Sequence, residues 1–113
     1  MILIIRERVT PEQLTQMCEA FGETLVKLAV DVERGILAGG GDLYADCEQA
    51  WLEDGSRQAD IWGADWYPLE REVGFESLIN IRPKQNNRSM EVQDPALRAR
   101  IEAIVRQAFE VEA

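Results

Sequence analysis

The sequence predicts an α+β fold in which a small antiparallel sheet of three to four strands is covered on one face by two amphipathic helices. Two segments, 11–21 and 95–109, repeat apolar residues at the helical period and begin with capping residues. Residues 25–33 instead alternate apolar and polar side chains, which is typical of a strand. At 113 residues the chain is predicted to form a single domain, 1–113, with one hydrophobic core.

Both helices have marked starts. Thr10 is a natural N-cap, Pro11 fits the first helical position, and Gln13 completes a capping box. The apolar stripe that follows consists of Leu14, Met17, Cys18 and Phe21. At the second helix Asp94 is the expected cap and Pro95 the first residue. Its stripe consists of Leu97, Ile101, Ile104, Val105, Ala108 and Phe109.

The predicted strands lie near 2–8, 25–33, 36–41 and 76–82. A tight turn at Arg34 and Gly35 joins the second strand to the third as a hairpin. Residues 42–53 favour a helix by composition, with Asp42 as its cap, although the same letters could continue the preceding strand.

Residues 55–74 are interpreted as an irregular, aromatic loop that contains Trp62, Trp66 and Tyr67. Such a loop can pack back on the body of the protein, or it can form the aromatic rim of an interaction surface. If the helices cover only one face of the sheet, the other face with this loop could form a homodimer surface.

The composition excludes several classes of function. A net charge of −9 opposes nucleic-acid binding, which depends on cations that neutralise phosphates. No apolar run is long enough to cross a membrane, and the apolar start is followed directly by Arg6, Glu7 and Arg8, so we expect a cytoplasmic protein. The absence of histidine excludes Ser-His-Asp and Cys-His catalysis within the chain. Cys18 and Cys47 are expected to be reduced and near the core.

The most function-like feature is residues 78–90, which carry three cations and no carboxylate in an acidic protein. The candidate ligand-binding residues are Arg82, Lys84, Asn86, Asn87, Arg88 and Ser89. Arginine binds phosphate and carboxylate groups in a bidentate manner, and turn amides add further donors. The alternative is structural: the arginines pair with nearby carboxylates and the asparagines satisfy turns.

Carboxylates at Asp31, Glu33, Asp46 and Glu48 could in principle hold a metal or act as acid and base. Nothing in the sequence brings the two pairs together, so we expect neither a metal nor a cofactor. The acidic neighbours of Cys47 would raise the pKa of its thiol, which disfavours a reactive cysteine.

Four segments carry a resemblance to a known family: 30–41 (VDVERGILAGGG), 45–48 (ADCE), 61–64 (IWGA), and 78–83 (LINIRP) with 87–89 (NRS). Together they resemble a family of small uncharacterised bacterial proteins, prominent in cyanobacteria, that is known as a domain of unknown function. The resemblance spans essentially the whole chain and implies a free-standing cytoplasmic protein. It implies no activity.

Two classes of function follow. The favoured one is a non-catalytic binding or interaction module that recognises an anionic ligand or a protein partner through 82–89. The alternative is a small enzyme acting on a phosphorylated or carboxylated metabolite. In that enzyme Arg82 and Arg88 would clamp the anion and Asp31, Glu33 or Asp46 would serve as base or metal ligand.

Overall fold

The computed structural model describes residues 2–41 and 43–109 of the chain. Within them, five antiparallel strands form one sheet in the order β1-β3-β2-β4-β5. The strands are β1 (Leu3–Ile5), β2 (Val26–Asp31), β3 (Ile36–Gly39), β4 (Ile61–Tyr67) and β5 (Glu72–Gly74). The α-helices are α1 (Pro11–Met17), α2 (Tyr44–Glu53) and α3 (Pro95–Phe109). Four single 3₁₀ turns are η1 (Gly22–Thr24), η2 (Gln58–Asp60), η3 (Leu78–Asn80) and η4 (Pro83–Gln85).

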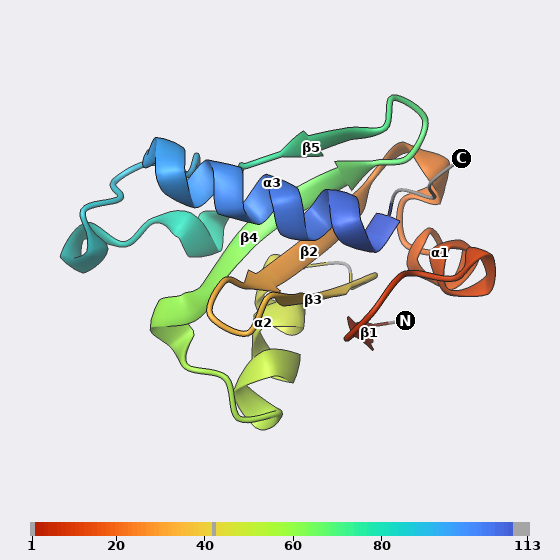
Figure 1. The fold of residues 1–113 in the computed structure, drawn as a ribbon, viewed down its shortest axis with the longest axis horizontal. Coiled ribbons are helices and arrows are strands. Elements are labelled where there is room, and N and C mark those ends of the chain that lie inside the picture. Colours follow the sequence, from red (N-terminus) through yellow and green to blue (C-terminus); the bar gives the residue numbers. More distant parts are fainter. Residues whose placement is uncertain (1, 42, 110–113) are drawn as a thin grey trace.

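One face of the sheet is covered by α3, which crosses β4 and β2 (Figure 1). Leu28, Val30 and Trp66 point into this main core from the strands, and the ring of Trp66 stacks on Phe109 of α3 with centroids 5.1 Å apart. Helix α1 adds Met17 to the same core. Burial of these large side chains is the main stabilising contribution of this face.

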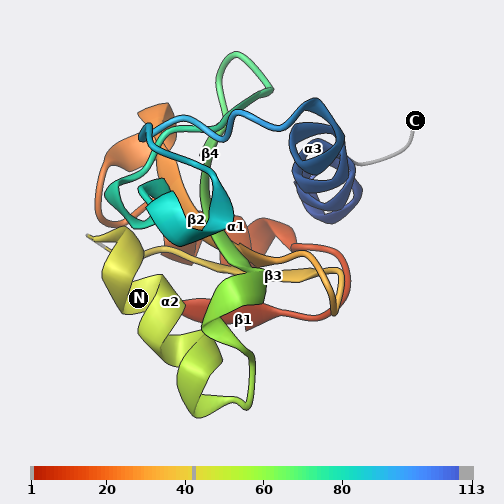
Figure 2. The same cartoon turned by 90° about the vertical axis from the view of Figure 1, so that its left-hand side faces the viewer.

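The opposite face is covered by α2 and, beside it, by the turn η3 (Figure 2). Here Cys47 and Trp51 of α2 pack on Ala29, Ala38 and Ile61 of the sheet. Small residues on β2 and β3 allow the helix to approach closely. The prediction that helices cover only one face is therefore wrong, and the open face on which a homodimer was predicted is occupied by the chain itself.

Most predicted helices and strands are confirmed. Helix α3 spans 95–109 as predicted, and the helix predicted at 42–53 is confirmed as α2, which begins at Tyr44; its predicted cap, Asp42, lies outside the described residues. The Thr10 capping box is present, but α1 ends at Met17 rather than at Phe21. The hairpin of β2 and β3 turns at residues 32–35, with Gly35 at a positive φ of 73°.

Two predictions for the second half of the chain are wrong. The region that contains Trp62 and Trp66 is not a loop, because 61–67 is the longest strand of the sheet and both tryptophans are buried in the main core. Tyr67 is half-buried at the end of the same strand. Residues 76–82, predicted as a strand, instead contain η3, and their β-pairing is limited to isolated bridges from Glu76 to Glu91 and from Arg82 to Asn87.

None of the helices in the described ranges, 2–41 and 43–109, has both the length and the apolar character needed to cross a membrane.

Candidate functional site

Residues 78–90, which we call the 78–90 segment, lie against the edge of β4 that β5 leaves uncovered. The anchor is Asn80, whose side chain is fully buried. Its amide oxygen accepts from the Gly63 N–H (2.8 Å) and its amide nitrogen donates to the Gly63 carbonyl (3.0 Å), so the side chain substitutes for a peptide group of a neighbouring strand. The same nitrogen also donates to the carbonyls of Phe75 and Met90.

This pairing requires glycine at position 63. A Cβ atom there would lie 2.3 Å from the Cβ of Ser77 and 2.5 Å from its hydroxyl oxygen. Ser77 is fully buried, and its backbone N–H donates to the Met90 carbonyl at 2.9 Å. The glycine that interrupts the apolar pattern of β4 therefore marks the place where the 78–90 segment approaches the sheet.

The second anchor is Asn87, which is 4% exposed. Its amide nitrogen donates to the carbonyls of Asn80, Ser89 and Glu91, and its amide oxygen accepts from the Gln93 N–H. Its backbone pairs with Arg82 in both directions, at 2.6 and 3.0 Å, which closes residues 82–87 into a tight loop.

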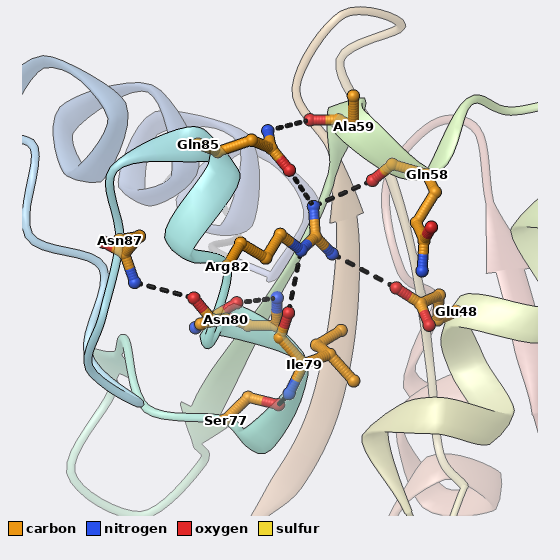
Figure 3. Close-up of polar contacts among 10 residues, drawn as sticks. Glu48, Gln58, Ala59, Ser77, Ile79, Asn80, Arg82, Gln85 and Asn87 are labelled. Carbon is orange, nitrogen blue, oxygen red and sulfur yellow. Dashed lines mark hydrogen bonds and ion pairs between the residues drawn. The ribbon is translucent and has the colours of Figure 1, made fainter.

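Arg82 fastens this loop to the rest of the protein (Figure 3). The guanidinium group donates to the carbonyls of Ile79 (2.9 Å) and Gln58 (2.8 Å) and pairs with Glu48 of α2 at 3.1 Å. It also lies over the Trp62 ring, 4.7 Å from the centroid. Burial lowers the pKa of Arg82, and the Glu48 carboxylate acts in the opposite direction. The group remains charged, because a guanidinium group does not lose its proton in proteins.

The predicted ligand-binding residues therefore divide into two groups. Arg82 and Asn87 are internal anchors, and Ser89 uses its hydroxyl to accept from the Glu91 N–H. Lys84, Asn86 and Arg88 are exposed, and Asn86 has the left-handed backbone (φ 60°) that ends η4. Among the described residues, neither Lys84 nor Arg88 has a side-chain ion-pair partner.

Large apolar side chains are exposed on the same segment. Leu78, Ile81 and Met90 are 69%, 46% and 42% exposed. Leu78 and Met90 lie on neighbouring backbone stretches, because the N–H of Ser77 bonds to the Met90 carbonyl. The strand prediction had placed Leu78 in the sheet, so this exposed apolar character was missed.

Two surface hollows flank the loop. One, of about 450 Å³, is lined by Gln58, Ala59, Arg82, Pro83, Lys84 and Gln85. The other, of about 630 Å³, is lined by Trp62, Gln85, Asn86, Asn87, Gln93, Asp94, Pro95 and Leu97. Both volumes are in the range of ligand sites, but the second is lined largely by amide and carboxylate groups rather than by converging cations.

The four carboxylates considered from the sequence do not meet. Asp31 is buried in the β2–β3 turn, where it accepts from the backbone N–H groups of Glu33 and Arg34 and from the Ser56 hydroxyl. Glu48 pairs with Arg82, while Glu33 and Asp46 are exposed. Across residues 2–41 and 43–109, no group of three acidic or cysteine side chains could hold a metal ion.

Sequence reasoning missed one polar cluster. Asp65 of β4 is 2% exposed and accepts a hydrogen bond from the Tyr44 hydroxyl at the start of α2. Burial raises the pKa of Asp65 to about 6, and burial followed by the bond to Asp65 raises the pKa of Tyr44. The only signal in the sequence was the position of Asp65 between Trp62 and Trp66. Because the region was predicted to be a loop, this signal did not indicate a buried carboxyl group.

The fold and the site together define a class of protein: a small α+β protein that displays a rigid, cationic and apolar loop beside a sheet covered on both faces. The chain belongs to the family described as "Protein of unknown function (DUF5674)", which matches residues 3–108. The resemblance inferred from the sequence is thereby confirmed at the level of a domain of unknown function. Neither a curated protein nor a solved structure matches the chain.

Proposed function

We propose that this protein is a non-catalytic interaction module whose 78–90 segment binds an acidic segment of a protein partner. The surface has two components: the exposed cations Lys84 and Arg88, and the exposed apolar side chains of Leu78, Ile81 and Met90. Exposed apolar side chains grouped with charges are typical of protein-binding surfaces.

The observation that carries this proposal is the internal pairing of Arg82. A clamp for a small phosphate or carboxylate needs two arginines free to converge on it. Arg82 is instead engaged by Glu48, Ile79 and Gln58, and its side chain is only 11% exposed. The same pairing weakens the alternative of a metabolite enzyme, because that enzyme relied on Arg82 and Arg88 together.

The partner is expected to be acidic because of charge complementarity. The protein carries a net charge of −9, whereas the 78–90 segment contains no carboxylate. An acidic partner would be repelled by most of the surface and attracted to this segment, which favours one orientation of binding. Apolar side chains on the partner would then gain affinity by covering Leu78 and Ile81.

The rigidity of the segment supports the same role. Asn80, Asn87 and Arg82 fix its backbone through buried hydrogen bonds, so little conformational entropy is lost when a partner binds.

The proposal is tested with a panel of fluorescently labelled peptides that carry Leu or Phe between Glu residues, each with a counterpart in which Lys replaces Glu. We expect the acidic peptides to bind and the basic ones not to, with affinity that falls as salt is added. Leu78→Ala should weaken binding several-fold. The matched control is Leu69→Ala, because Leu69 is exposed to a similar extent (64%) but lies outside the segment.

Equal weakening by the two leucine variants, or tighter binding of the basic peptides, would contradict the proposal. Binding of inorganic phosphate, lost in Arg88→Ala but unaffected by Leu78→Ala, would instead favour a small-anion site.

A further inference from the structure

The cluster around Asp65 serves neither the 78–90 segment nor the main core. Asp65 lies on the α2 side of the sheet, on strand β4, which pairs with β2 and β5. The groups that face it are Tyr44 from α2, Lys27 opposite on β2, Tyr67 on its own strand and Glu76 after β5. Asp65 is thus a buried acid under the first turn of a helix, with one cation as its cross-strand neighbour.

The two ends of α2 are held differently. At the C-terminal end the Trp51 indole donates to the Ala29 carbonyl at 2.8 Å, and Asp54 pairs with Arg6 and Arg34. At the N-terminal end the cap residue, Leu43, has no side-chain oxygen to accept from the first N–H groups. The bond from Tyr44 to Asp65 therefore fastens the uncapped end of the helix to the sheet.

We propose that Asp65 is a proton-linked latch for α2: ionisation of its carboxyl group favours release of the first turn of the helix from strand β4. In the closed state the carboxylate is shielded from water by α2. When the first turn lifts, water solvates the charge, whereas a neutral carboxyl group gains little from that exposure. This device is independent of the proposed function of the 78–90 segment.

The size of the effect follows from linkage. Burial raises the pKa of Asp65 to about 6, and the charge of Glu76 acts in the same direction, while the bond from Tyr44, the backbone hydrogen bond from Glu76 and the charge of Lys27 lower it. In an opened helix turn the carboxyl group returns to an ordinary pKa near 3.8. The equilibrium constant for opening therefore rises by roughly a hundredfold between pH 4 and pH 7, and levels off above that range.

Cys47 reports this opening. It lies one turn after Tyr44, is fully buried, and has a thiol whose pKa is raised by burial. In a Cys18→Ala background, Cys47 is the remaining thiol of the chain. Its rate of modification by a dithiodipyridine reagent, divided by the rate in the urea-unfolded chain at the same pH, gives a protection factor that does not depend on the intrinsic reactivity of the thiol.

We expect this protection factor to fall by roughly a hundredfold from pH 4 to pH 7, with the midpoint of its logarithm near pH 5 and a plateau above about pH 6. Asp65→Asn should abolish the fall. Tyr44→Phe removes a donor that stabilises the carboxylate, so it should move the midpoint upward, and it tests the latch even if Asp65→Asn does not fold. The opening should also respond weakly to low urea, because a local event exposes little surface.

The latch would be overturned by a protection factor that is flat across this pH range. A fall of equal size in Asp65→Asn would overturn it as well, as would a urea dependence as steep as that of global unfolding.

Discussion

Asn80→Ala tests whether the 78–90 segment is built on a single buried amide. The substitution removes two hydrogen bonds to Gly63 and one each to the carbonyls of Phe75 and Met90. At about 1 kcal/mol for each bond, and with the Gly63 N–H left buried and unpaired, we expect the free energy of unfolding to fall by about 3 to 4 kcal/mol. This should lower the urea midpoint by roughly 2 M.

The assay is urea unfolding followed by tryptophan fluorescence. The matched control is Asn86→Gly, which removes the same side chain from an exposed residue whose left-handed backbone suits glycine, and it should change stability by less than about 0.5 kcal/mol. A loss below about 1 kcal/mol in Asn80→Ala would refute the reasoning, because it would mean that water replaces the amide at no cost.

Three further predictions use the same unfolding assay. Gly63→Ala should lower the free energy of unfolding by about 1 to 3 kcal/mol, because the new Cβ would meet the Cβ of Ser77. Adding Ser77→Gly should recover part of this loss, and an absence of recovery would show that the strain does not come from Ser77. Arg82→Ala should lower the free energy of unfolding by about 3 kcal/mol, since it leaves Glu48 unpaired at a mostly buried site. Arg88→Ala should lower it by less than about 0.5 kcal/mol. Similar losses in the two variants would contradict the conclusion that Arg82 is an internal anchor and Arg88 a surface residue. Because the pKa of Asp65 is raised to about 6, wild-type stability should fall by up to about 3 kcal/mol as pH rises from 4 to 6, and in Asp65→Asn this fall should disappear; a wild-type profile that rises over this range would reverse the assigned sign.

The helices and strands that were predicted correctly are those marked by patterns of neighbouring residues. The capping box at Thr10, the Asp94-Pro95 start and the 3.6-residue stripe identified two helices, and alternation identified the β2–β3 hairpin. Strand β4 was missed because it is covered on both faces, so apolar and polar residues do not alternate along it. Gly63 and Asp65 interrupt the apolar run of this strand because of residues that are distant in the sequence. Ser77 approaches Gly63 too closely for a larger side chain, and the Tyr44 hydroxyl donates to Asp65.

The sequence singled out the 78–90 segment, but it did not indicate the structural roles of the residues in it. Arg82 and Arg88 look equivalent in sequence, and only the fold brings Glu48, which is 34 positions away, to Arg82. Asn80 was predicted to be a strand residue and Asn87 to be a ligand-binding residue. The sequence therefore did not show that both are buried anchors of the same segment. Leu78 and Ile81 were predicted to be strand residues, and their exposure follows from the 3₁₀ turn that replaces the strand.

The central claim, that Lys84 and Arg88 direct an acidic partner to the 78–90 segment, is tested most directly by a charge swap. Fluorescence anisotropy would compare the wild type with the Lys84→Glu, Arg88→Glu double variant against an acidic peptide that binds the wild type and its Lys-for-Glu counterpart. We predict that the double variant loses the acidic peptide and gains the basic one, while Arg71→Glu, a reversal outside the segment, leaves both affinities unchanged. Retention of the acidic peptide by the double variant would contradict the account.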